Sequence, residues 1–139
     1  MKLKIRKAKF GDINTLVKLT KTPEFIFPGG SDFAKKYLKD FIQRGIFFVA
    51  EENKKVAGFV SAQITLGKEL WIDMLVVDKK ERRRGIGTKL VKKIIKIARN
   101  RKMKMVFLDA PLFNKNTIHF YKKLGLKKEK KFVWFTKEF

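Results

Sequence analysis

Cysteine is absent from this chain of 139 residues, and histidine occurs only once. The lack of cysteine excludes a disulfide framework, a thiolate metal site and a cysteine nucleophile. A single histidine among scattered carboxylates supplies no cluster of ligands, so we expect no metal site. A chain without cysteine also fits a reducing compartment, and we expect it to work in the cytoplasm.

Long apolar runs are missing as well. No uncharged stretch approaches the roughly 20 residues that a helix needs to cross a bilayer. Residues 1–7 alternate apolar and basic side chains, so they lack the continuous apolar core of a signal peptide. We therefore expect no interaction with a membrane.

Acidic residues are scarce: 13 Asp and Glu stand against 35 Lys and Arg, which gives a formal net charge of +22. Such an imbalance attracts polyanions and steers a charged cofactor toward its site. The basic residues are spread from Lys2 to Lys137 and often alternate with core-type positions, as they do on a solvated surface. Nucleic acid is therefore a partner that the charge allows but that the pattern does not favour.

The length and the 45% of hydrophobic residues predict one domain, residues 1–139, with a sizeable core. In its first half, a half-exposed strand near Ile5 precedes a short helix that Asp12 caps. Two prolines and a glycine pair make residues 22–30 a loop, whose Phe25 and Phe27 either line a substrate mouth or, more commonly, anchor the loop. Ser31 or Asp32 then caps a second helix that reaches residue 45, and its apolar stripe is assigned to the core. Members of that stripe are Phe33, Tyr37, Leu38, Phe41 and Ile42.

Strand patterns at 46–50, 56–66 and 69–77 predict an antiparallel meander. An amphipathic helix over 86–100 and a strand over 103–110 complete a βαβ unit, which forces one parallel pair. A last helix runs from about Asn116 to Gly125, and residues 127–139 are expected to form a closing strand. The predicted fold is α/β (α+β): a mixed, mostly antiparallel central sheet flanked by about four helices.

The most informative segment follows the strand that ends at Val77. It is a basic, glycine-punctuated turn, Arg82-Arg83-Arg84-Gly85-Ile86-Gly87-Thr88, in which a helical pattern begins. Glycine lets the backbone approach a ligand, and the first N–H groups of a helix have no internal acceptors, so they can bind phosphate oxygens. The turn therefore predicts a phosphorylated cofactor.

A second motif lies further along the chain, Asn114-x-x-Thr117-Ile118-x-Phe120-Tyr121-x-x-x-Gly125-Leu126. Together with Arg82-x-x-Gly85-x-Gly87, and in the same order, it resembles the paired motifs of the GNAT superfamily of N-acetyltransferases. The resemblance runs over nearly the whole chain and is most specific over 70–126. It implies a GNAT-like fold, acetyl-coenzyme A as cofactor, and transfer of the acetyl group to a primary amine by direct attack in a ternary complex.

The resemblance also implies site residues. The pantetheine arm would bind backbone groups at a splayed strand edge, and the basic turn would surround the pyrophosphate, with Asn114 bonding the cofactor arm. Arg83 departs from the family, where glycine is frequent at that place. The implied cofactor-binding residues are Leu75, Val76, Val77, Arg82, Arg83, Arg84, Gly85, Ile86, Gly87, Thr88, Asn114 and Tyr121.

Catalysis needs an acid for the departing thiolate and a base for the acceptor amine. Tyr121 matches the acid of the family. Asp109, five residues before Asn114, is the first candidate for the base and Asp73, inside an apolar strand, is the second. Either carboxylate can instead be a structural cap or an ion-pair partner.

Other functions remain open at the level of sequence. A GNAT-like module whose basic surface binds nucleic acid or ribosomal particles is the main alternative, and a translation-linked acetyltransferase is a third. The acceptor is not revealed, although the region before Ile46 is where such enzymes choose it. An aromatic tail at residues 134–139 also suggests a homodimer.

Overall fold

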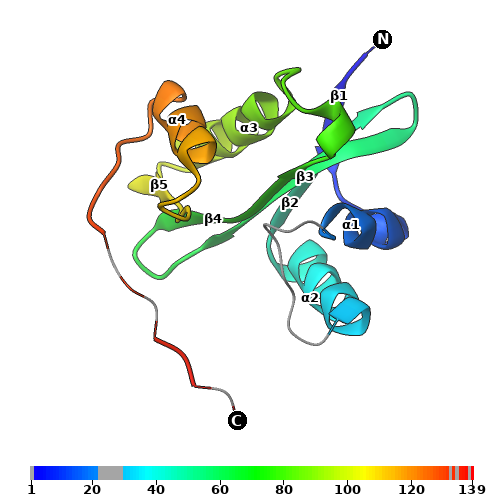
Figure 1. Ribbon diagram of the computed structural model, residues 1–139, viewed down its shortest axis with the longest axis horizontal. Helices are drawn as coiled ribbons and strands as arrows, with labels where there is room; N and C mark the ends of the chain where they lie inside the picture. The colour runs from blue at the N-terminus through cyan, green and yellow to red at the C-terminus, as the bar shows by residue number, and fades with distance from the viewer. Residues whose placement is uncertain (1, 22–29, 132, 134, 138) are drawn as a thin grey trace. The chain divides into compact units, whose positions relative to one another are not determined.

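The computed structural model describes residues 2–21, 30–131, 133, 135–137 and 139. Two compact units make up the chain, residues 1–108 and residues 109–139. The second unit contains α4 (Lys115–Lys123) (Figure 1). The first contains, in order, β1 (Lys4–Lys7), η1 (Phe10–Asp12), α1 (Ile13–Leu19), α2 (Gly30–Arg44), β2 (Ile46–Glu52), β3 (Lys55–Ile64), β4 (Glu69–Val77), η2 (Lys79–Glu81), α3 (Ile86–Asn100) and β5 (Met105–Phe107).

One five-stranded sheet organises the first unit, with the strands in the order β1-β2-β3-β4-β5. Neighbours from β1 to β4 are antiparallel, whereas β5 runs parallel to β4 after the crossover through α3. The predicted mixed, mostly antiparallel sheet is therefore confirmed. Its last strand is shorter than expected, because only residues 105–107 of the predicted 103–110 pair with β4.

Helices cover both faces of this sheet (Figure 1): α1 and α2 lie on one face and α3 on the other. α3 buries one side of its amphipathic pattern, as predicted, including Leu90, Val91 and Ile94. On the opposite face, Leu16 of α1 and Leu38 of α2 are fully buried against Phe59 of β3. Burial of three such side chains stabilises the layer by about 5 kcal/mol or more, at roughly 1.5–3 kcal/mol each.

The pairing of β3 with β4 contains a bulge, which affects the face of the sheet that α1 and α2 cover. Ser61 pairs with Met74, but Ala62 pairs with Ile72, so Asp73 is an extra residue on β4. Such a bulge bends the strand and re-aims a side chain. Here Asp73 and Met74 both face the α1–α2 layer, since Met74 belongs to its core and Asp73 bonds Tyr37 of α2.

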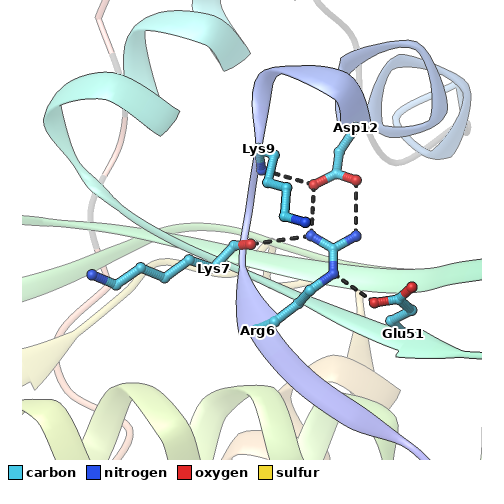
Figure 2. Close-up of polar contacts among 5 residues, drawn as sticks. All are labelled: Arg6, Lys7, Lys9, Asp12 and Glu51. Atoms are coloured by element: carbon cyan, nitrogen blue, oxygen red, sulfur yellow. Dashed lines mark hydrogen bonds and ion pairs between the residues drawn. The ribbon is translucent and has the colours of Figure 1, made fainter. Parts of the chain in front are cut away.

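Polar contacts fix the start of the chain to the sheet (Figure 2). Arg6 of β1 donates two hydrogen bonds of 2.9 Å to the carboxylate of Asp12 and one of 2.6 Å to Glu51 of β2. Asp12 also accepts the backbone N–H of Lys9 at 2.8 Å. The guanidinium therefore ties β1, the turn into α1 and β2 together at one point.

Two helix starts differ from the sequence prediction. Asp12 precedes α1 but makes no side-chain cap to it, because both of its oxygens are taken by Arg6 and Lys9. α2 begins at Gly30, so Ser31 and Asp32 lie inside its first turn and neither is the capping residue.

Two further expectations were wrong. Phe33 is 43% exposed and does not belong to the core, unlike Leu38 on the same helix. The described residues of 127–139 form no strand, since Val133, Phe135 and Phe139 are exposed and no neighbour pairs with them. Phe25 and Phe27 lie outside the described residues, as do Phe132 and Trp134.

The second unit contains the predicted last helix. Asn114 N-caps α4, its side-chain oxygen accepting the N–H of Thr117 at 3.2 Å. Gly125 follows the helix with φ +89°, the left-handed conformation that favours glycine after a helix end. Across the described residues of both units, every helix is too short or too polar to span a membrane.

Candidate functional site

A basic turn joins β4 to α3. Asp78 begins it by capping η2, its carboxylate accepting the N–H of Lys80 at 3.2 Å. Gly85 ends it with φ +80°, directly before α3. Arg83, at the position where the family often has glycine, also has a positive φ of 65°, which costs a residue with a side chain about 1–2 kcal/mol. The turn therefore keeps the glycine-like backbone although the side chain is an arginine.

The first turn of α3 offers backbone donors. Its first helical hydrogen bond runs from the N–H of Lys89 to the carbonyl of Gly85, at 3.0 Å, and no side chain caps the helix. Within the part of the chain that the structure describes, the N–H groups of Ile86, Gly87 and Thr88 donate to no protein acceptor. Three such donors at the positive end of a 15-residue helix can bind an anion.

An open strand edge leads to this turn. β4 pairs with β5 only through Glu69, Leu70 and Trp71, so the rest of that edge has no strand partner among the described residues. Asp78 donates its N–H to Ala57 at 2.8 Å and so points toward β3. Because backbone groups alternate between the two edges of a strand, those of Val77 and Leu75 point to the open edge.

The same alternation directs the backbone groups of Val76 toward β3, where this residue pairs with Phe59. Of the three residues predicted to receive the cofactor arm, two therefore present hydrogen-bonding groups at the open edge. Val76 instead contributes its side chain to the core.

The arginines of the turn have protein partners. Arg82 donates from Nε to the carbonyl of Val77 at 3.1 Å. Arg84 donates two hydrogen bonds of 2.9 and 3.0 Å to Glu52 of β2 and another to Glu81. Hydrogen bonding by Glu52 and then Glu81 raises the pKa of Arg84, and Arg84 lowers the pKa of Glu52. Arg84 thus joins the turn to the end of β2.

The second unit contains three further predicted residues, Asp109, Asn114 and Tyr121. Tyr121 lies on α4, where burial, with a smaller contribution from the charge of Asp109, raises its pKa to about 12. Its ring packs edge-on against Phe120, with the centroids 5.1 Å apart. Tyr121 therefore keeps its proton at neutral pH, as a general acid must. His119, on the same helix, is exposed.

The two candidate bases have different surroundings. Asp109 is exposed and belongs to the second unit. Asp73 is half-buried in the first unit, where its Oδ2 accepts a hydrogen bond of 2.6 Å from the hydroxyl of Tyr37. Burial, and then the hydrogen bond and charge of Asp73, raise the pKa of Tyr37 above its usual range.

Two residues that bond predicted site residues do not stand out in the sequence: Tyr37, which bonds Asp73, and Glu52, which bonds Arg84. Tyr37 belongs to the apolar stripe of its helix, four residues after Phe33, and such a pattern predicts a core residue with no polar partner on β4. Glu52 ends the largely apolar strand β2. An acidic residue at the end of such a strand is a signal for a basic partner, which here is Arg84. Groups of three or more potential metal ligands do not occur in the described residues.

Known proteins that resemble this chain include acetyltransferases, and the family model that matches it includes both sequence motifs. The family model described as Acetyltransferase (GNAT) family matches residues 15–126. An uncharacterized N-acetyltransferase, MJ1207, of Methanocaldococcus jannaschii is 36% identical over 105 residues, which is 70% of this chain and 46% of that protein. An N-alpha-acetyltransferase of Sulfurisphaera tokodaii is 30% identical over 141 residues, covering 91% of this chain and 81% of that one. The chain thus spans less than half the length of the first of these relatives.

Solved structures share the fold. The PaiA N-acetyltransferase of Thermoplasma acidophilum, solved in complex with coenzyme A, superposes with a TM-score of 0.82 at 21% identity. The match covers 93% of this chain and 92% of that one, which establishes the architecture. The family model spans more than half of the chain and both sequence motifs, so this protein belongs to the GNAT family of acetyltransferases.

Proposed function

We propose that this protein is an N-acetyltransferase that moves the acetyl group of acetyl-coenzyme A to a primary amine of a still unidentified acceptor. One observation carries the proposal: the open edge of β4 ends at the turn that leads into the uncapped N-terminus of α3. An extended amide-bearing arm suits the first feature and a diphosphate suits the second. The coenzyme A bound to the Thermoplasma protein has both groups, which supports this assignment.

The cofactor would be held mainly by the main chain. Leu75 and Val77 would pair with the amides of the arm, while the N–H groups of Ile86, Gly87 and Thr88 would bind the pyrophosphate. Gly85 permits the tight approach. Side chains of the turn and of the second motif would add to this, with Asn114 offering its amide nitrogen because its oxygen caps α4.

The chemistry requires proton transfers at the acceptor nitrogen and at the departing thiolate. The acceptor ammonium loses one proton to a base, and the neutral amine attacks the thioester carbonyl. As the C–S bond of the tetrahedral intermediate breaks, its nitrogen gives up a second proton, which replaces the one that the acid donates to the departing thiolate. We assign the protonation of that thiolate to Tyr121, whose raised pKa keeps the phenol protonated. Asp109 remains our first candidate for the base and Asp73 the second. The acetyl group passes directly, with no acyl-enzyme intermediate.

Calorimetry with coenzyme A and acetyl-coenzyme A tests cofactor binding. Release of free thiol over a panel of amines and peptides with free N-termini then tests transfer. The proposed function requires saturable binding of both forms and thiol release that depends on the amine. Folded protein that binds neither form would refute it.

A second candidate function rests on the outer face of α3. This helix carries no acidic residue, and its cations Lys89, Lys92, Lys96 and Arg99 are exposed at spacings of three and four residues. Within the described residues they form no ion pair. Such a stripe suits a nucleic-acid backbone. A steep fall of RNA affinity with salt, lost when Lys89, Lys92 and Lys96 become Glu, would support this function.

The remaining organisation is also proposed. Residues 1–139 would act as one catalytic domain, because the family model extends through both compact units. We expect the protein to act in the cytoplasm, consistent with the lack of cysteine. Pairing of two copies through residues 134–139 stays a prediction that light scattering can test. Phe135 and Phe139 are almost fully exposed in the single chain, which supports it.

A further inference from the structure

The bulge on β4 places a half-buried carboxylate in an otherwise apolar stretch of the strand. Asp73 is the extra residue of the β3–β4 pairing, and it interrupts an apolar strand. A half-buried charge at such a position costs free energy unless it is paired or used. Its bond from Tyr37 is 2.6 Å long, a length typical of a phenol bonded to an ionised carboxylate. That bond fixes the carboxylate on the α2 side of the sheet.

Aromatic rings adjoin this carboxylate on its helical side. Tyr37 stacks with Phe33 at 6.1 Å between ring centroids and tilts against Phe41 at 5.6 Å. Phe33 is exposed, so this row of rings on α2 reaches from the core to the protein surface.

A second aromatic pair lies on the same face of the sheet, at β4 and β5. Trp71 lies two residues before Asp73 on β4 and therefore on the same face of the strand. Its indole stacks on Phe107 of β5, with 6.1 Å between centroids and 5° between the planes. Both residues are half-buried, although they lie at the end of the sheet. This aromatic pair therefore lies along the same face of the sheet as the carboxylate.

A carboxylate bonded to a row of aromatic side chains is suited to an ammonium group with an apolar neighbour. The carboxylate supplies the opposite charge, and aromatic rings attract cations through their electron-rich faces. A second ammonium would meet net positive charge, because the exposed cations of α2, Lys35, Lys36, Lys39 and Arg44, outnumber its exposed acids, Asp32 and Asp40, and the whole chain has a net charge of +22. The surroundings select one ammonium, not several.

We propose that Asp73 binds the ammonium of the acceptor, that Tyr37 is the residue that positions this carboxylate, and that the acceptor is a monocationic primary amine with an apolar or aromatic group close to its nitrogen. This inference rests on the proposed acetyl transfer and assigns its acceptor class. It concerns binding, so it holds whichever group takes the proton from the amine.

The test uses 2-phenylethylamine as the probe and NMR titration as the measurement, on the full chain with and without coenzyme A. Propylamine lacks the ring, and spermidine adds charge. The wild type should bind 2-phenylethylamine saturably, about tenfold more tightly than propylamine, because the ring adds apolar and aromatic contact. Spermidine should bind no more tightly than propylamine.

Variants assign the binding to the two residues. Asp73→Asn should weaken binding of 2-phenylethylamine about tenfold or more, since it removes the charge partner. Tyr37→Phe should weaken it about threefold, because the ring stays and only the orienting hydroxyl is lost. Asp40→Asn is the matched control: it makes the same charge change on α2, in an exposed pair with Arg44, and should change binding less than twofold.

Kinetics with the same amine separates positioning from a structural role. Tyr37→Phe should raise the KM for the amine while the Kd for coenzyme A and the thermal midpoint stay near those of the wild type. Lack of saturable binding to the wild type, equal affinity in Asp73→Asn, or tighter binding of spermidine would each overturn the inference. Absence of coenzyme A binding would instead refute the proposed function, and the amine titration reports independently of it.

Discussion

Arg6 and Asp12 form a two-pronged ion pair in which both hydrogen bonds measure 2.9 Å, while the remaining guanidinium Nε–H bonds Glu51. Their side chains are only 17% and 12% exposed, so water screens the pair weakly. A planar guanidinium can satisfy both acidic partners at once, which the point charge of a lysine cannot do. The pair therefore fixes the entry of the chain into the sheet (Figure 2).

Arg6→Lys should lower the free energy of unfolding by about 2 kcal/mol, since one or more hydrogen bonds to partly buried carboxylates are lost. Urea denaturation monitored by circular dichroism measures this change. Arg44→Lys is the matched control, because Arg44 and its partner Asp40 are 79% and 58% exposed and such a pair contributes little. Equal effects of the two substitutions would contradict the role assigned to Arg6.

The same pair predicts how stability depends on pH. Hydrogen bonding by Arg6 lowers the pKa of Asp12 below its ordinary value, with a further contribution from the N–H of Lys9. A lowered folded-state pKa means that the unfolded chain binds a proton first as the pH falls. The stabilisation from Asp12 is thus complete above about pH 5 and is lost as the pH falls through the folded-state pKa.

The free energy of unfolding, measured in urea, should therefore fall between pH 7 and pH 2. Asp12→Asn should make this fall smaller, because it removes the part that is due to Asp12. The variant will be less stable at neutral pH, and its difference from the wild type will shrink toward acid. Parallel pH curves for the two proteins would show that Asp12 has the same pKa in the folded and unfolded states. Arg6 does not titrate in this range, so it adds no slope of its own.

Much of this arrangement follows from sequence patterns, and the rest depends on contacts between distant residues. Periodicity predicts α3 because its apolar positions recur on one helical face, and the glycine motif predicts where that helix begins. The structure adds that Gly85 has a positive φ. The bulge at Asp73 left no local sign, since β4 alternates buried and half-buried residues through it without interruption. The identity of the hydroxyl that bonds this carboxylate depends on how α2 packs against β4. The described residues after Gly125 pair with no strand, although their sequence is strand-like.

Gly87→Trp should abolish measurable binding of coenzyme A, because an indole at the first turn of α3 would occupy the space through which a diphosphate reaches the N–H groups. Lys96→Trp places the same side chain on the outer face of the same helix and should leave the Kd within about twofold. Calorimetry gives both values, and thermal unfolding shows whether each variant is folded. Wild-type affinity in folded Gly87→Trp would exclude this turn as the diphosphate site.

Arg84→Gln separates the contribution of the main chain from that of a side chain. Arg84 is already bonded to Glu52 and Glu81, so its charge is largely balanced before any phosphate arrives. We expect the Kd for coenzyme A to rise only about threefold, far less than with Gly87→Trp. A rise of more than about 100-fold would mean that Arg84 leaves its carboxylates and binds the cofactor directly.

Tyr121→Phe tests the acid. Loss of the phenol should lower kcat about 100-fold, within the range that general acids contribute, while the Kd for coenzyme A changes less than about threefold. Because burial and then Asp109 raise the pKa of Tyr121 to about 12, the wild type should show no loss of rate from deprotonation of this tyrosine below about pH 11. His119→Gln, an exposed change on the same helix, should leave kcat unaltered. A kcat in Tyr121→Phe that matches the wild type would mean that water protonates the thiolate, and the raised pKa of Tyr121 would then reflect only its burial.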